Sequence, residues 1–190
     1  MRGMENDPAH QHALVGDPCR ANHRRYLSEI ASTMTTGTGT ALREVDALKA
    51  ITAYARELLS EGVIWQLPDP RGVLDVLVSH HVLTRSQVSD EPSVQFAHQR
   101  FQEWFAANHL LLRLKLASHP GDGLARREFQ WAILNEPIWG EALRFLAECL
   151  AEDDLAGAQA QELIFMAMSV DLVFAAELAH LAGWNRLGSV

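Results

Sequence analysis

Apolar residues recur every three or four positions between Leu42 and Leu59, and charged residues occupy the opposite side of a helical wheel. This spacing predicts an amphipathic helix that begins near Thr40 and ends at 61–62, where a glycine can adopt the left-handed conformation that ends many helices. One side of such a helix is apolar and must pack against another element. The pattern therefore predicts a folded domain around this helix.

A second helix and two short strands are expected next. Apolar residues predict a helix from near Arg71 to about His80, preceded by a proline turn and by a short extended piece at Val63–Trp65. Val82–Arg85 and Ser93–Phe96 are β-like and are separated by a polar loop, which predicts a hairpin. Helix, helix and hairpin is the order of elements in a winged helix.

The first forty residues show no sustained apolar period. Pro8, Pro18 and the run Ser32–Thr40 favour loop. A short helix of about two turns is expected over Arg24–Ala31, where three apolar side chains share one side. We therefore predict a flexible arm with a short helix over residues 1–43.

The second half of the chain is rich in alanine and leucine and predicts further helices. His98–Leu114 forms the first, and the break at His119–Gly123 ends it, which places a domain boundary there. We expect a winged-helix domain over 44–118 and a helical-repeat segment over 119–190. In that segment the predicted helices are 124–134, 138–151, 155–168 and 170–182, the last after a cap-like Ser169. Short turns between them are typical of antiparallel pairs, the unit of an α-solenoid.

Composition and charge narrow the function classes. The 190 residues are 48% hydrophobic and 21% charged, which is typical of a soluble globular chain. No stretch approaches the roughly 18 apolar residues of a membrane span, and the first thirty residues do not read as a signal peptide. We therefore expect a cytoplasmic protein. The net charge is −8 and only Lys49 and Lys115 are lysines, so nucleic acid is an unlikely default partner.

One segment joins the second strand to the following helix with an unusual mixture of aromatic and polar residues. It reads FAHQRFQEWFAA over residues 96–107. This segment resembles the end of the winged-helix domain in NACHT-type STAND NTPases, which are signalling ATPases of innate immunity and of bacterial anti-phage defence. The family pattern there is Phe-x-His-x-x-Phe-Gln-Glu-aromatic-hydrophobic-Ala-Ala. The chain matches it at Phe96, His98, Phe101, Gln102, Glu103, Trp104, Phe105, Ala106 and Ala107.

The resemblance covers roughly residues 20–155 and implies a role for His98. In the family this histidine contacts the β-phosphate of ADP and holds a closed resting state, which suits a donor at the start of a helix. The aromatic residues of the segment would fix the helix, and Gln102 and Glu103 would satisfy buried polar groups. Read from the residues alone, His98 could instead cap the helix or form a hydrogen bond within its own domain.

The chain also departs from the family. It has no GxxxxGK[ST] motif, since the glycine-rich run Thr36–Thr40 lacks the lysine, and no apolar strand ends in paired acids that could hold magnesium. ATP hydrolysis by the family's mechanism is therefore not expected, and ADP or ATP is implied only for the complete architecture. The chain would be the part downstream of a nucleotide-binding core, as a truncated frame, an excised domain or a stand-alone protein.

Other candidate sites are weaker. His10, His12 and His23 lie in the predicted arm, and the adjacent His80 and His81 point in different directions on a helix, so we expect no metal site. Cys19 and Cys149 are expected to be free thiols, and Cys149 lies on the apolar side of its helix, where packing explains it.

These observations predict a mainly α, non-catalytic regulatory and interaction fragment. Its partner would be a nucleotide-binding core or another protein, with self-association through the C-terminal helical face as a further route. Two alternatives stay open: a winged-helix DNA-binding transcription regulator, and a stand-alone helical adaptor. The helix that would enter the DNA groove in such a regulator, Arg71–His81, carries one arginine, no lysine and Asp75, which disfavours the regulator.

Overall fold

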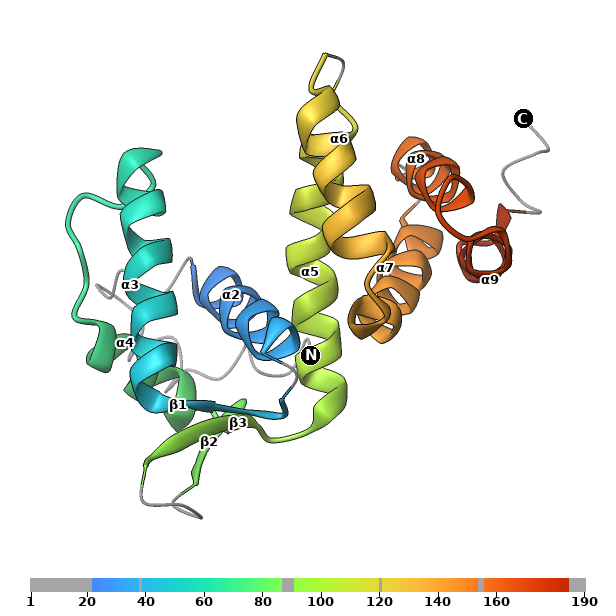
Figure 1. The fold of residues 1–190 in the computed structure, drawn as a ribbon. Coiled ribbons are helices and arrows are strands. Elements are labelled where there is room, and N and C mark those ends of the chain that lie inside the picture. Colours follow the sequence, from blue (N-terminus) through green and yellow to red (C-terminus); the bar gives the residue numbers. More distant parts are fainter. Residues whose placement is uncertain (1–21, 38, 87–90, 120, 154–155, 185–190) are drawn as a thin grey trace. The chain divides into compact units, whose positions relative to one another are not determined.

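The fold is mainly helical, with a small three-stranded antiparallel sheet (Figure 1). The computed structural model describes residues 22–37, 39–86, 91–119, 121–153 and 156–184. The chain divides into two compact units, Met1–Phe105 and Ala106–Val190. This division lies inside one helix, and the break predicted at 119–123 is the connection between that helix and the next.

Three helices and the sheet make up the first unit. They are α2 (His23–Thr36), α3 (Glu44–Ser60) and α4 (Pro70–Ser79). Helix α3 packs on both other helices, and its Ile51 and Leu58 are fully buried. The amphipathic spacing seen in the sequence therefore places these side chains in the core, and Asp69 caps α4 through the backbone N–H groups of Arg71 and Gly72.

The sheet contains the predicted hairpin and one strand that the sequence did not reveal. Strands β2 (Leu83–Ser86) and β3 (Ser93–Phe96) pair as expected. Strand β1 (Ala41–Arg43) pairs with the other edge of β3, giving the order β1-β3-β2. The sequence pattern places Leu42 at the start of the long helix, whereas in the structure Leu42 lies in β1, opposite Val94. A strand of three residues is too short to show alternation, so only its pairing reveals it.

In the described part of the arm, the structure corrects the prediction that residues 32–40 form a loop. Helix α2 continues through Thr36, beyond the predicted end at Ala31. Met34 continues its buried side one turn after Ile30. The Thr33 hydroxyl donates to the carbonyl of Glu29, so threonine in this helix satisfies its side chain locally. Val63–Trp65 forms no strand and lies in the loop between α3 and α4.

Helix α5 (Gln99–Ala117) begins in the first unit and continues into the second. The second unit then contains α6 (Gly123–Phe129), the π-helical turn η1 (Gln130–Leu134), the 3₁₀ turn η2 (Pro137–Trp139), α7 (Gly140–Glu152), α8 (Gly157–Met168) and α9 (Leu172–Leu181). Helices α7, α8 and α9 contact one another, and α8 also contacts η1. The predicted helices are thus present, with the first ending in a π turn and the second starting as 3₁₀.

The last helix starts at a different residue from the one predicted. Asp171 caps α9, since its carboxylate accepts from the backbone N–H groups of Val173 (2.8 Å) and Phe174 (3.0 Å). Ser169 instead follows the end of α8, where its hydroxyl donates to the carbonyl of Met166. A carboxylate is favoured at this position because it also faces the positive end of the helix dipole.

Among the described residues, none of the helices has the length and apolar character needed to cross a membrane.

Candidate functional site

The segment singled out in the sequence forms the passage from β3 into α5. Phe96 ends the strand, and His98 directly precedes the first helical residue. The His98 side chain is exposed, its ring centroid lies 5.5 Å from that of Phe101, and its carbonyl accepts from the Phe101 N–H. An exposed imidazole at the start of a helix can donate a hydrogen bond to an anion that another molecule holds.

Aromatic packing fixes this passage within the first unit. The rings of Phe96 and Phe105 stack with centroids 5.7 Å apart, and Trp104 meets Phe105 edge-on at 4.8 Å. The buried side chain of Gln102 donates to the carbonyl of Gly39, 3.3 Å away, and so ties α5 to the segment before β1. Glu103 accepts from the Gln99 side chain on the surface instead of meeting a buried group.

A network of charged side chains joins three elements of the same unit. The Glu44 side chain at the start of α3 is only 11% exposed and accepts from Arg85 Nε of β2 at 3.0 Å. Arg85 also donates to Asp75 of α4 at 2.5 Å, and Arg71 of α4 lies 3.8 Å from Glu44. These carboxylates raise the pKa of Arg85, with the Asp75 hydrogen bond as the largest cause. The network holds the hairpin against α3 and α4.

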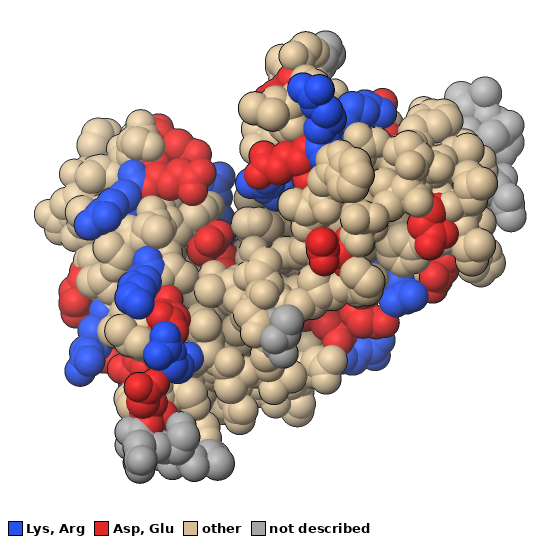
Figure 2. Space-filling view, in the orientation of Figure 1, with Lys and Arg blue, Asp and Glu red and all other residues tan. Residues whose placement is uncertain are grey.

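This network also decides the charge that α4 presents. Arg71 and Arg85, the arginines beside this helix, both face carboxylates. On the face of this unit seen in Figure 2, basic and acidic side chains are interspersed. Such a surface gives a phosphate backbone little net attraction.

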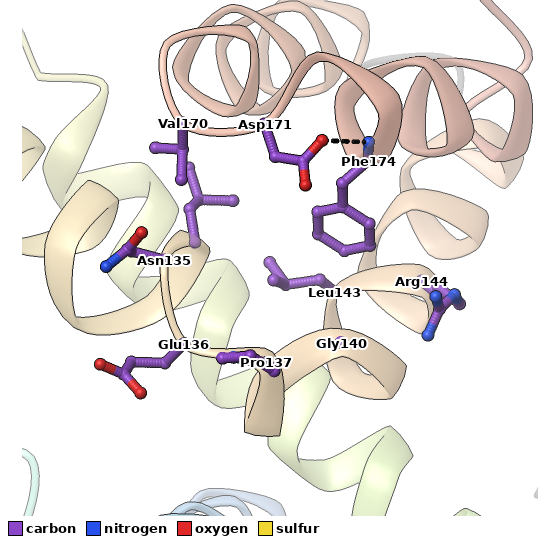
Figure 3. Close-up of a pocket in the computed structure, with 10 residues that line it drawn as sticks. Asn135, Glu136, Pro137, Gly140, Leu143, Arg144, Val170, Asp171 and Phe174 are labelled. Carbon is purple, nitrogen blue, oxygen red and sulfur yellow. Dashed lines mark hydrogen bonds between the residues drawn. The ribbon is translucent and has the colours of Figure 1, made fainter.

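A groove in the second unit was not anticipated from the sequence. It has a volume of about 320 Å³ and lies between the connection from η1 to η2, helix α7 and the start of α9. The side chains of Leu143 and Phe174 point into it (Figure 3). The residues that line it are Leu134, Asn135, Glu136, Pro137, Gly140, Leu143, Arg144, Val170, Asp171 and Phe174.

Two acidic residues, Glu136 and Asp171, line this groove, and two more pair with its arginine. Arg144 Nε donates to Glu177 at 2.7 Å, and another of its nitrogens donates to Glu141 at 2.7 Å, while its guanidinium lies 5.6 Å from the Phe174 ring centroid. Its hydrogen bond, and then its charge, lower the pKa of Glu177. One guanidinium balances one of these two carboxylates, and Glu136 and Asp171 add two more around the groove.

A second, smaller pocket contains the half-buried Cys149. Its volume is about 240 Å³ and Lys115, Asp153 and Gln159 also line it. Burial, together with the charges of Glu152 and Glu148, raises the pKa of the Cys149 thiol. A raised pKa leaves less thiolate at neutral pH, and the thiolate is the reactive form.

The histidines do not form a metal site in the part of the chain that the structure describes. No three His, Cys, Asp or Glu side chains gather closely enough there to hold a metal ion. His81 follows α4 with a positive φ of 58° and ends the helix. His10, His12 and Cys19 lie outside the described residues.

The groove residues went unnoticed because they lie far apart in the sequence. The Asn135–Pro137 turn and the 169–171 break are visible as helix boundaries, and Arg144 follows Glu141 at a spacing that allows an ion pair. Only the packing of α7 against α9 brings these positions together. The signal that the sequence offered was the presence of an acidic residue at each of these two helix boundaries.

In comparisons with known proteins, no protein-family model, curated protein or solved structure matches this chain.

Proposed function

We propose that this chain is a regulatory and interaction segment, built as a winged-helix module followed by the first helices of a repeat array. The passage from β3 into α5, with an exposed histidine at its end, is the observation that carries the proposal. In this function the module docks on a nucleotide-binding core, as in the NACHT-type STAND ATPases that the segment at 96–107 resembles. The chain itself performs no catalysis.

The topology of the first unit supports the winged-helix part of the proposal. A strand, two helices and a hairpin follow one another, and β1 pairs with β3 to make a three-stranded sheet. A helix followed by a second helix and a wing-like hairpin is the arrangement expected of such a module. The ion pairs of Arg85 with Glu44 and Asp75 stabilise it by connecting the hairpin to both helices.

The surroundings of His98 support a phosphate contact. The backbone there is held by the Phe101 N–H, and α5 is anchored by the buried Gln102 and by the stacked rings of Phe96 and Phe105. A side chain on such a fixed base loses little further freedom when it binds an anion. The nucleotide would come from the partner, because this chain lacks the P-loop lysine and the magnesium-binding acids.

The second unit supports the alternative of a helical protein-interaction adaptor. Several large apolar side chains of α8, α9 and η1 are exposed, among them Trp131 (70%), Leu172 (68%) and Val173 (81%). Exposed apolar surface of this kind marks interaction sites. Both the regulatory segment and the helical adaptor would bind a protein partner. The remaining alternative, a DNA-binding regulator, has less support, because Arg71 and Arg85 face carboxylates.

The proposal is tested by ADP retention. Calorimetry of the chain alone with ADP, with and without magnesium, should show no saturable binding. The P-loop protein that co-purifies with the tagged chain is then loaded with fluorescent ADP. The release of this ADP from the P-loop protein is followed with and without added chain. We expect the chain to slow release and His98→Ala to abolish the slowing.

The matched control is His180→Ala, because His180 is also an exposed histidine but lies on α9. It should slow release as the unaltered chain does. Saturable ADP binding by the chain alone, or equal release with His98→Ala and His180→Ala, would contradict the role given to His98.

A further inference from the structure

We propose that the groove between α7 and α9 binds a basic amphipathic segment of a partner protein. Its occupant carries apolar side chains that enter the groove and lysine or arginine side chains that meet the acidic rim. This inference concerns the second unit only and does not depend on the role of His98.

The groove is large enough for side chains of a partner and has apolar walls. Its volume of about 320 Å³ is in the range of pockets that hold a small ligand or a few side chains. Leu134, Leu143 and Phe174 supply apolar surface inside it. Leu172 and Val173, which precede Phe174 on the first turn of α9, are exposed and do not line the groove.

The walls of the groove are held in place by defined contacts. Asp171 fixes the first turn of α9 through two backbone hydrogen bonds, and Arg144 joins α7 to α9 through Glu177. Next to the lining residue Val170, the Gln130 side chain donates to the Ser169 hydroxyl at 2.6 Å and so connects η1 to the end of α8. Because its walls are already fixed, the groove loses little conformational entropy when a ligand enters.

Charge selects the class of partner. Asp171 and Glu136 line the groove, and Glu141 and Glu177 share the single guanidinium of Arg144. Residues 106–190 contain eleven Asp and Glu against six Lys and Arg, so the field of the whole unit is negative. A second copy of this chain would bring the same negative charge, whereas a basic segment is attracted.

The experiment uses fluorescence anisotropy with the full chain at about 0.15 M salt, where long-range attraction is screened. The probe is a labelled amphipathic helix of leucine and lysine. Two matched probes replace either every lysine by glutamate or every leucine by serine. We expect saturable one-to-one binding of the leucine–lysine probe and much weaker binding of both others.

The decisive variant is Asp171→Asn with Glu136→Gln, which removes two charges at the groove. Asparagine keeps the capping hydrogen bonds and loses only the smaller interaction of the charge with the helix dipole, so α9 should stay folded. The control is Glu148→Gln with Glu152→Gln, which removes two charges from exposed positions of α7 that do not line the groove. We expect the groove variant to weaken binding about fivefold or more and the control to weaken it less than about twofold.

Three results would overturn the proposal. Equal weakening by both variants would mean that the probe responds to the net charge of the unit only. Equal binding of the glutamate probe would remove the charge argument. Sedimentation that shows a dimer broken by Phe174→Ala would assign the groove to a second copy. None of these results bears on ADP retention, so this proposal and the proposed function fail separately.

Discussion

Arg85 Nε lies 3.0 Å from Glu44 Oε2, although the two residues are 41 positions apart in the sequence. This ion pair joins the hairpin to the start of the long helix α3, and Asp75 and Arg71 extend it to α4. Because the Glu44 side chain is nearly buried, its charge depends on these partners for compensation. The relationship fixes the positions of β2, α3 and α4 in the first unit.

Replacing Arg85 should therefore destabilise the first unit. In Arg85→Met the Glu44 carboxylate keeps only the more distant Arg71, and we expect a loss of about 1–2 kcal/mol, with allowance for the solvent that reaches Arg85. Urea denaturation followed by circular dichroism measures it. Arg43→Met removes the ion pairs that the exposed Arg43 forms with Asp46 and Glu91 and serves as the control, for which we expect a much smaller shift of the midpoint. Equal shifts would show that the burial of Glu44 has no consequence.

Two adjacent leucines of α3 should respond very differently to truncation. Leu58 is fully buried and Leu59 is 37% exposed. We expect Leu58→Ala to lower the free energy of unfolding by about 2–5 kcal/mol, because it loses apolar contact and leaves a cavity. Leu59→Ala should cost less than about 1 kcal/mol, since much of its surface already meets water. Urea denaturation of the two variants checks the helix orientation, and similar costs would contradict it.

The pair of Arg144 and Glu177 should make stability depend on pH. Arg144 lowers the pKa of Glu177 from its ordinary value of 4.5. A group with a lowered folded pKa adds stability above the unfolded pKa and loses this contribution as the pH falls through the folded pKa. We expect the difference in melting temperature between the unaltered chain and Glu177→Gln to shrink on acidification below pH 4.5. A difference that stays constant down to about pH 3 would show that the pair does not act in solution.

Cys149 should react slowly with thiol reagents. Burial and nearby carboxylates raise the pKa of its thiol above the ordinary 9.0, so little thiolate is present at neutral pH. The rate of reaction with a disulfide reagent, measured in Cys19→Ser to isolate this thiol, should be below that of a free cysteine peptide at pH 7. The rate should rise about tenfold per pH unit from pH 7 and should still be rising beyond pH 9, because the thiolate fraction grows until the pH passes the raised pKa. Fast reaction at pH 7 would instead point to an activated thiol.

The pairing of arginines near α4 predicts weak contact with nucleic acid. We expect no retention of a duplex DNA probe at about 0.15 M salt, because the arginines beside this helix face carboxylates. Gel shift or anisotropy measures it. Asp75→Asn, which removes one of these carboxylates, should increase any weak binding seen at lower salt. Tight, strongly salt-dependent binding by the unaltered chain would favour the transcription-regulator alternative.

Local pattern determined most of the helices and the hairpin. The three- and four-residue spacing from Leu42 to Leu59 marks most of α3, and the alternation at 82–85 and 93–96 marks β2 and β3. Proline and glycine mark the breaks between them. These signals are readable because helix and strand periods are properties of neighbouring residues. The same signals place His98 at a strand-to-helix passage, while its contact with a nucleotide remains a prediction.

Long-range packing decided the rest. Strand β1 forms because it pairs with an edge of β3. Helix α2 extends to Thr36 because the side chain of Met34 is buried in the core. The Glu44–Arg85 pair and the groove between α7 and α9 join residues that are more than thirty positions apart. The spacing of neighbouring residues does not predict these long-range contacts, since they depend on how whole elements pack. The sequence by itself therefore determined where elements form, and only the tertiary structure decided which charges and apolar surfaces they bring together.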